Sequence, residues 1–237
     1  MSQQPDDMRS LVDYLNKTAH AYYVLDDPLI SDAEWDRLYS RLQQMEKKQG
    51  VVLPDSPSLR VGGEPLAAFR QHRHLSRLWS MDKAQSPEEL QAWFDRTEKL
   101  RAQERSLPPL TYGVEYKFDG LTLNLTYDHG VLIEAATRGN GEVGEAILPQ
   151  ARTVRGVPLS IPWQGLIEVQ GECIMRLSAL RKYNETAAEP LKNARNAAAG
   201  ALRNLDPAVT AARNLSAFFY QVGTIENPPF SDQVGMV

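Results

Sequence analysis

The 237-residue chain has a single cysteine, Cys173, and only four histidines. One cysteine excludes an internal disulfide and is typical of a reducing compartment, so we expect a cytoplasmic protein. The histidines are scattered, at positions 20, 72, 74 and 129, and give no zinc-binding spacing. We therefore assign no metal-ligating residues, and we expect the closest pair, His72 and His74, to have surface or packing roles.

Long hydrophobic runs and strong positive charge are also missing. No stretch approaches the roughly 18 apolar residues that span a bilayer, and the polar start of the chain is unlike a secretion signal. The net charge of −4 argues against a strongly basic nucleic-acid-binding protein. Residues 176–213 nevertheless carry 7 basic and 3 acidic side chains. This part could meet phosphate, although solvated helix faces explain the pattern equally well.

The first residues predict two helices joined by a loop. Apolar residues at helical spacing mark residues 8–25, and the Asp-Asp-Pro sequence at 26–28 ends this helix. Ser31 and Glu34 form a capping box for a second helix, which extends to about Lys48. A connector rich in proline and glycine follows, so we expect a small helical domain over residues 1–66 and a second domain over residues 67–237.

The second domain combines a capped helix with a strand-rich region. Ser86, followed by proline and two glutamates, predicts the start of the helix. An Asp-His-Gly turn at 128–130 predicts a hairpin. Strands are expected at 112–118, 121–127, 131–138, 166–173 and 215–222, and helices at 176–189 and 193–204. The sum is an α+β fold behind a small helical module.

Lys117 stands between two acidic residues at the end of an expected strand. Side chains alternate along a strand, so Glu115, Lys117 and Asp119 would project to one side, next to a turn at Gly120. A lysine in this position is a nucleophile once it has lost its proton, or a salt-bridge partner while it keeps it. Residues 117–120 alone leave both interpretations open.

The stretch from Glu115 to Gly120 resembles motif I of the covalent nucleotidyltransferases, the polynucleotide ligases and mRNA capping enzymes, and it fits the bacterial NAD-dependent DNA ligases best. The resemblance implies a helical cap followed by an adenylation domain with an antiparallel, ATP-grasp-like sheet. It makes Lys117 the nucleophile that takes AMP from NAD and releases nicotinamide mononucleotide (NMN). In the family, the Glu115 position recognises the adenine amino group, and the Asp119 position helps orient the nucleotide and the metal. Activation of the lysine needs further cations or Mg²⁺.

A loop about twenty residues further on resembles the family's Thr-Arg-Gly-Asp-Gly sequence. The resemblance implies that Arg138 contacts the ribose or the phosphates. Asn140 replaces the usual Asp, and Ala146 replaces an acidic residue, so both changes weaken any carboxylate role there. Without the resemblance, the segment would be an ordinary turn at a hairpin end.

Three later segments continue the resemblance. Motif III ends at Glu172, which in the family contacts the ribose or a metal. A run that resembles one peculiar to NAD-dependent ligases carries Arg195 and Arg203, which would face the nucleotide or the DNA backbone. Motif IIIa supplies Tyr220, whose ring would stack on adenine, while the two phenylalanines before it are expected in the core.

The N-terminal helices resemble the cap found only in the NAD-dependent ligases, where it binds the NMN half of NAD. The matching residues are Tyr22, Tyr23, Asp32, Trp35 and Asp36. Aromatic rings can stack on nicotinamide, and carboxylates can hold ribose hydroxyls. The family usually has His in place of Tyr23 and Tyr in place of Trp35. Without the resemblance, Tyr22 and Trp35 would form a plain helix–helix core.

The resemblance also implies the cofactors and partners. Ser80 and Met81 would lie near the adenylate, NAD and Mg²⁺ would be used, and nicked double-stranded DNA would be the partner in replication and repair. We expect a monomer that does not associate with membranes. The similarity stops at about Gly223, before the family's motifs IV and V, so we expect a truncated chain that does not seal nicks alone.

Two alternatives remain open. The first is a non-catalytic remnant that binds NAD or another nucleotide, which the changes at Tyr23, Trp35, Asn140 and Ala146 would favour. The second is a ligase or capping-type nucleotidyltransferase that uses ATP or GTP, against which the N-terminal cap argues. The sequence leaves the conformation of the cap and the preferred DNA ends undetermined.

Overall fold

The computed structural model describes residues 7–236, apart from residues 24, 26, 61–67 and 105. The chain forms two compact units. The first joins the residues up to Leu78 with Phe118–Pro229, and the second joins Trp79–Lys117 with the residues from Phe230 onward. The expected domain boundary between residues 66 and 67 lies outside the described residues.

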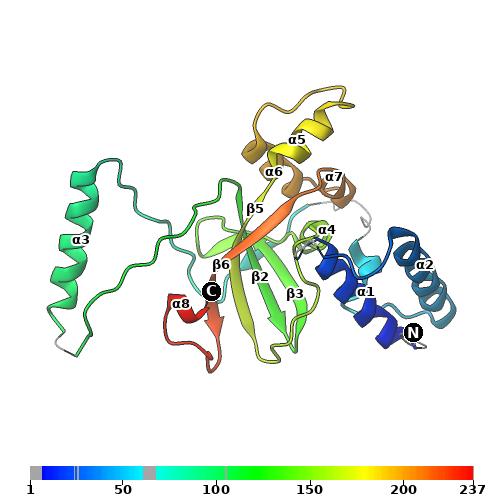
Figure 1. Cartoon of the computed structure of the whole chain (residues 1–237), viewed down its shortest axis with the longest axis horizontal. Helices are drawn as coiled ribbons and strands as arrows, with labels where there is room; N and C mark the ends of the chain where they lie inside the picture. The colour runs from blue at the N-terminus through cyan, green and yellow to red at the C-terminus, as the bar shows by residue number, and fades with distance from the viewer. Residues whose placement is uncertain (1–6, 24, 26, 61–67, 105, 237) are drawn as a thin grey trace. The chain divides into compact units, whose positions relative to one another are not determined.

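The first unit begins with the two expected helices, α1 (Met8–Tyr23) and α2 (Asp32–Gln49) (Figure 1). They pack through fully buried leucines, among them Leu11, Leu15, Leu38 and Leu42. The capping prediction for α2 is confirmed, because the Ser31 side chain accepts a hydrogen bond from the Glu34 amide at 3.3 Å. Gly50 ends α2 in the left-handed conformation, with φ at 67°.

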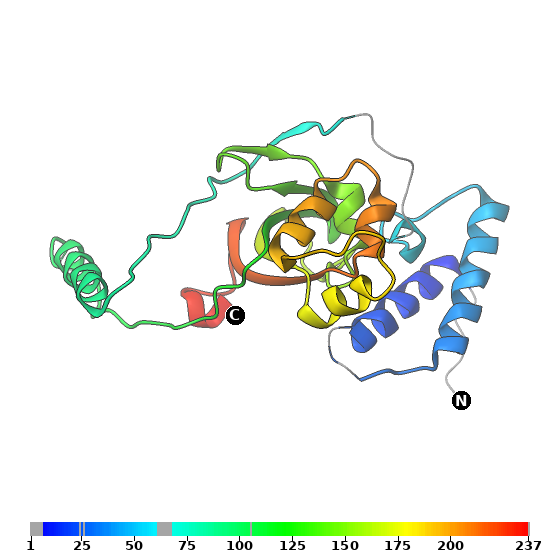
Figure 2. The same ribbon diagram turned by 90° about the horizontal axis from the view of Figure 1, so that it is seen from above.

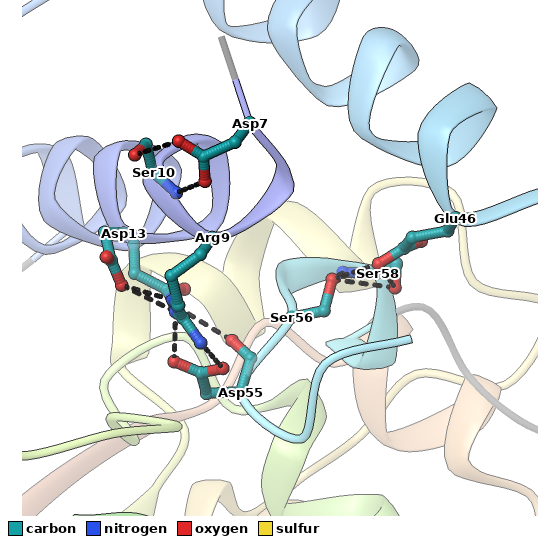
Figure 3. Close-up of polar contacts among 9 residues, drawn as sticks. Asp7, Arg9, Ser10, Asp13, Glu46, Asp55, Ser56 and Ser58 are labelled. Carbon is teal, nitrogen blue, oxygen red and sulfur yellow. Dashed lines mark hydrogen bonds and ion pairs between the residues drawn. The ribbon is translucent and has the colours of Figure 1, made fainter. Parts of the chain in front are cut away.

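Polar contacts tie both helices to the 3₁₀ helix η1 (Pro57–Arg60) and the residues before it (Figure 3). The Arg9 guanidinium donates to both oxygens of the buried Asp55 carboxylate, at 2.8 and 2.7 Å. The Glu46 carboxylate at the end of α2 accepts from the hydroxyls of Ser56, at 2.5 Å, and Ser58, at 3.0 Å. Because these carboxylates are buried or half-buried and hydrogen-bonded, the contacts fix the helix pair to its base.

A four-stranded antiparallel sheet forms the centre of the first unit, in the order β3-β2-β5-β6. Its strands are β2 (Leu121–Asp128), β3 (Val131–Thr137), β5 (Ile167–Ile174) and β6 (Ser216–Ile225) (Figure 1). The expected hairpin joins β2 to β3, with His129 and Gly130 at φ values of 48° and 76°. The predicted α+β class with an antiparallel sheet is therefore confirmed.

One face of the sheet is apolar. Leu123, Leu125 and Cys173 are fully buried there, against short helices that lie over the sheet (Figure 2). The helices that contribute buried residues to this core are α4 (Leu148–Thr153) and α6 (Ala194–Leu202). In α7 (Pro207–Ala212), the buried Thr210 hydroxyl donates to the Ala201 carbonyl oxygen of α6 at 2.8 Å. α6 contributes only small residues and one leucine to the core, so its backbone can lie close to the strands.

The opposite face is polar and yet largely buried. Cross-strand partners share a face, and the register pairs Thr122 with Glu172, Asn124 with Gln170, and Thr126 with Glu168. All of these side chains except the half-buried Thr122 are buried. Buried polar groups need hydrogen-bond partners, so this face requires a polar cover.

The segment around β1 (Gln71–Arg73) supplies part of this cover. β1 pairs with β4 (Val143–Glu145). Beyond β1, the Glu168 carboxylate accepts from the amides of Leu75 and Ser76, at 3.0 and 3.1 Å, and from the Ser76 hydroxyl at 3.2 Å. The segment is thereby bound across the sheet. Neither β1 nor β4 was expected from the sequence.

The second unit contains α3 (Pro87–Arg101) and α8 (Gln233–Met236). The Ser86 capping prediction is confirmed, since its hydroxyl accepts from the Glu89 amide at 3.2 Å. Trp93, Phe94 and Tyr112 form an edge-to-face aromatic group, with Phe94 and Tyr112 centroids 4.6 Å apart.

Two secondary-structure predictions need correction. The strand expected at 112–118 is wrong: these residues pair with none of the described strands, and a strand without a partner lacks its hydrogen bonds. The helix expected at 176–189 is shorter, because α5 (Leu177–Asn184) stops where the Asn184 side chain bonds both backbone groups of Leu191. Among the described helices, none has the length and hydrophobicity needed to cross a bilayer.

Candidate functional site

Four of the five cap residues expected to bind a nucleotide surround one cavity. The cavity has a volume of about 400 Å³, and α1, α2 and the loop between them form most of its wall. Tyr22, Asp32, Trp35 and Asp36 all line it. The side chain of Tyr23 lies outside the described part of the structure. Two aromatic rings and two carboxylates thus meet in a space of the size that small-molecule ligands occupy.

Trp35 is held in a defined orientation within α2. Its ring stacks on Tyr39 one helical turn later, with centroids 5.0 Å apart and planes 13° apart. The indole N–H is buried and has no hydrogen-bond partner among the described residues. A buried indole donor usually has a partner, so a ligand that accepts a hydrogen bond would complete this site.

Arg155 also lines the cavity, although no motif in the sequence indicates it. It follows α4, far from α1 and α2 in the sequence, so no local pattern could have indicated it. A neighbouring cavity of about 340 Å³ shares Ala19 and Arg155 with the first and is also lined by Lys17 and His20.

A second set of expected residues lies at one end of the polar face of the sheet. Glu172 accepts hydrogen bonds from the Gly120 amide at 3.2 Å and from the Thr122 hydroxyl at 3.3 Å. A side chain at position 120 would meet the Cys173 carbonyl oxygen at 2.0 Å, so only glycine fits there. The motif I turn and the motif III glutamate are therefore held together by the pairing of β2 with β5.

Tyr220 belongs to the same end of the sheet. Burial, and then the Glu172 charge, raise the pKa of its hydroxyl, which hydrogen-bonds to Thr122. Arg138 is near enough to oppose this rise in pKa. Phe218, expected in the core, is half-buried and stacks on Phe118 with centroids 4.1 Å apart. The structure thus brings Glu172, Arg138 and Tyr220 into one polar region.

The two arginines of the 193–203 run bind different carboxylates. Arg195, near the start of α6, forms an ion pair with Asp119 at 2.7 Å. Arg203, at the end of α6, holds both oxygens of Glu145 on β4, at 2.8 and 3.1 Å. The pair raises the pKa of Arg203. Arg195 therefore binds a motif I residue, Asp119, whereas Arg203 stabilises the contact between α6 and the β1–β4 pair.

Asn140 has a clear role in the loop after β3. Its side-chain oxygen accepts from the amides of Glu142 and Val143, both at 2.9 Å. Gly139 and Gly141 on either side have positive φ, at 57° and 94°. An amide oxygen makes these bonds as a carboxylate oxygen would, so the change from Asp keeps the shape of the loop.

His72, His74 and Glu168 form a group whose potential metal-ligand atoms lie within 4.8 Å of one another. Both ring nitrogens of the buried His74 already have partners, the Asn124 amide and the Arg138 carbonyl oxygen, each at 3.1 Å. Glu168 likewise accepts three bonds from the covering segment. These contacts give His74 a packing role, and through the Arg138 backbone it supports the loop.

The remaining expected residues belong to the second unit. Lys117, Glu115, Ser80 and Met81 are exposed there, and Glu115 accepts a hydrogen bond from the Gln233 side chain at 3.0 Å. Lys117 lies in a segment without regular secondary structure. The alternation of side chains that a strand would impose on residues 115, 117 and 119 is therefore absent.

Comparison with known proteins identifies the class to which this fold and these sites belong. Residues 66–236 match the family model of the NAD-dependent DNA ligase adenylation domain. Residues 1–62 match the DNA ligase-like, N-terminal NAD⁺-binding domain. The protein is thus an α+β nucleotidyltransferase adenylation domain behind a helical cap, as expected.

Curated relatives agree over nearly the whole chain. A DNA ligase of Alkaliphilus oremlandii is 58% identical over 94% of this chain, and one of Alkaliphilus metalliredigens is 53% identical over 99%. A DNA ligase of Finegoldia magna is 51% identical over 99%. The chain spans about a third of the length of these relatives, 34–36%. It belongs to the NAD-dependent DNA ligase family.

Proposed function

We propose that this chain is the self-adenylating part of an NAD-dependent DNA ligase. The unprotonated amine of Lys117 attacks the α-phosphorus of NAD. This is the phosphorus that carries the adenosine. A nitrogen–phosphorus bond forms, and the bond from this phosphorus to the bridging oxygen breaks. NMN leaves with that oxygen, the lysine nitrogen loses its remaining extra proton to solvent, and the product is lysyl-AMP.

The observation that carries this proposal is the cavity lined by Tyr22, Asp32, Trp35 and Asp36. Its rings offer faces for the nicotinamide, and its carboxylates can accept hydrogen bonds from ribose hydroxyls. A nucleotidyltransferase that takes AMP from ATP has no NMN to bind, so a cavity of this composition supports NAD as the donor. Tyr23, the fifth residue of the cap motif, would also bind NMN.

The adenosine half would use the residues at the end of the polar face. Tyr220 would stack on adenine, Glu172 would accept from the ribose, and Arg138 would bind phosphate. Glu115 would recognise the adenine amino group, with Ser80 and Met81 nearby. Arg195 would offset phosphate charge, and Arg203 would act indirectly or on DNA, since it holds Glu145 here.

Mg²⁺ fits the donor chemistry of this chain. Carboxylate oxygens are the ligands it prefers. Asp119, just before β2, and Glu172 on β5 would provide them, and Glu172 accepts a hydrogen bond from the Gly120 amide, next to Asp119 in the sequence. When bound, the ion would neutralise part of the phosphate charge. The cations of the chain itself, Arg138 and Arg195, would bind the phosphates and offset the charge that develops there.

A ligase of the length of these relatives, about three times that of this chain, would use this intermediate on DNA. AMP would pass from Lys117 to the 5′-phosphate at a nick, and the 3′-hydroxyl would then displace it and close the backbone. We place this activity in DNA replication and repair in the cytoplasm, with the ligase acting as a monomer on nicked double-stranded DNA. The chain described here would supply the first of the three steps.

Intact-protein mass spectrometry tests the proposal. After incubation with NAD and Mg²⁺, the chain should gain the mass of one AMP, and ATP should give no gain. Lys117→Arg should abolish the gain because a guanidinium is a poor nucleophile at neutral pH, whereas Lys99→Arg on α3 should leave it intact. Labelling of the Lys117→Arg variant would disprove the assignment. No labelling of the unaltered chain would favour the binding-only alternative.

A further inference from the structure

The cavity of the cap has an unusual balance of charge for a site that must hold a phosphate. Among the described residues that line it, two are carboxylates, Asp32 and Asp36, and one is a cation, Arg155. NMN carries a phosphate in addition to its ring and ribose. Two carboxylates alone would repel that phosphate in a partly enclosed space, and the Arg155 guanidinium offsets this repulsion.

We propose that Arg155 binds the phosphate of the NMN half of NAD and stabilises it as the leaving group. This inference rests on the proposed function, because it assumes that the cap cavity receives NMN. It adds a residue from outside the cap to a site whose other charged residues all lie on α2. The nucleotide-binding wall is then built from two distant parts of the sequence.

The backbone on both sides of Arg155 is rigidly held. Val154 and Val157 are fully buried, and the Val157 amide donates to the Val154 carbonyl oxygen at 3.0 Å. The Arg60 guanidinium donates to the carbonyl oxygens of Arg152, Val154 and Val157, at 3.3, 3.2 and 2.8 Å. The exposed Arg155 side chain therefore extends from a fixed turn, which lowers the entropy lost when it binds an anion.

The chemistry of the leaving group favours arginine at this position. Its planar guanidinium can donate two parallel hydrogen bonds to phosphate oxygens and stays charged at any working pH. As the phosphorus–oxygen bond breaks, negative charge grows on the NMN phosphate. A cation already in place stabilises this charge more in the transition state than in bound NAD, so it speeds lysine adenylation as well as binding NMN.

The neighbouring cavity is the main alternative location for the NMN phosphate. It is lined by Arg155, Lys17, His20 and Arg60, and it adjoins the first cavity at Ala19 and Arg155. The Arg60 guanidinium already donates to three backbone carbonyl oxygens. A phosphate deep in that cavity would depend on Lys17, whereas a phosphate at the cap cavity would depend on Arg155 alone. Lys17→Ala is therefore the matched control for Arg155→Ala.

The test compares two ligands that differ only in the phosphate. Isothermal titration calorimetry would measure the binding of NMN and of nicotinamide riboside to the unaltered chain, Arg155→Ala, Arg155→Lys and Lys17→Ala. We expect the unaltered chain and Lys17→Ala to prefer NMN by about tenfold or more. Arg155→Ala should lose this preference while its affinity for the riboside stays the same, and Arg155→Lys should keep part of it.

Two outcomes would overturn the proposal. One is an Arg155→Ala variant that keeps the preference for NMN; the other is a Lys17→Ala variant that loses it. AMP labelling from NAD separates this failure from failure of the proposed function. If the unaltered chain is labelled and either outcome occurs, the role of Arg155 alone is wrong. If the unaltered chain neither binds NMN nor is labelled, the proposed function fails as well.

Discussion

At the scale of single residues, burial decides how the groups of the sheet respond to pH. Cys173 lies on the apolar face of β5, and burial, followed by the Glu172 charge, raises the pKa of its thiol far above the ordinary value of 9.0. The thiol stays protonated in the folded protein, whereas in the unfolded chain it ionises near pH 9. The folded state thus holds one more proton above that pH.

Stability should consequently fall as the pH rises above about 9. The contribution of Cys173 is complete below that pH and declines by up to about 1.4 kcal/mol per pH unit above it. Urea unfolding between pH 8 and 10.5 would measure the slope, and Cys173→Ala should make it shallower. Some slope should remain from about pH 10, because burial also raises the pKa of Tyr127. Equal slopes for both proteins would contradict the prediction.

At the scale of elements, the Glu168 side chain helps to bind the covering segment to the sheet. The fully buried Glu168 on β5 accepts three hydrogen bonds from Leu75 and Ser76. A glutamine there has one accepting oxygen instead of two. Its amide NH₂ group, itself a donor, would face the backbone N–H donors. We expect Glu168→Gln to lower the free energy of unfolding by about 2–3 kcal/mol.

Equilibrium urea unfolding near pH 7 would measure this loss. Glu185→Gln, at the exposed end of α5, is the matched control and should change stability by less than about 0.5 kcal/mol. A loss at Glu168 no larger than at Glu185 would mean that other contacts fix the segment. Hydrogen exchange at the Leu75 and Ser76 amides should also be faster in Glu168→Gln, because these amides lose an acceptor.

At the scale of the whole molecule, Arg60 joins the helical cap to the rest of the first unit. It ends η1 and donates to three backbone carbonyl oxygens in and after α4. We expect Arg60→Ala to cost about 2–3 kcal/mol, since it leaves buried carbonyl groups unpaired. The cap should then unfold separately, so calorimetry should show two transitions where the unaltered unit shows one.

Arg37→Ala provides the control for this change. Arg37 is an exposed cap residue whose contact with Glu34 is 3.9 Å long, and surface pairs of this kind contribute little. A single unfolding transition for Arg60→Ala, at the temperature of the unaltered protein, would show that the apolar contacts alone couple the cap to the sheet. In the same calorimetry, adding NMN should raise the temperature of the cap transition, because ligands stabilise the state they bind.

Local chemistry made much of the fold predictable from the sequence. The capping residues Ser31 and Ser86 mark their helices through contacts within one turn. The Asp-His-Gly turn specifies the β2–β3 hairpin, because its last two residues adopt positive φ. The expected site residues came from the resemblance to the family motifs and not from spacing, and four of those in the cap line one cavity.

The sequence by itself determined the helix pair, the antiparallel strands and the identity of most residues around the two candidate nucleotide sites. The signals for the helices and strands lie within a few residues of one another, where local backbone geometry decides. The site residues came from the family motifs. Only the tertiary structure decided that the polar face of the sheet is buried, that residues 112–118 form no strand, and that Arg155 joins the cap cavity. These features depend on partners far along the chain, and strand pairing, burial and pocket composition exist only once those partners meet.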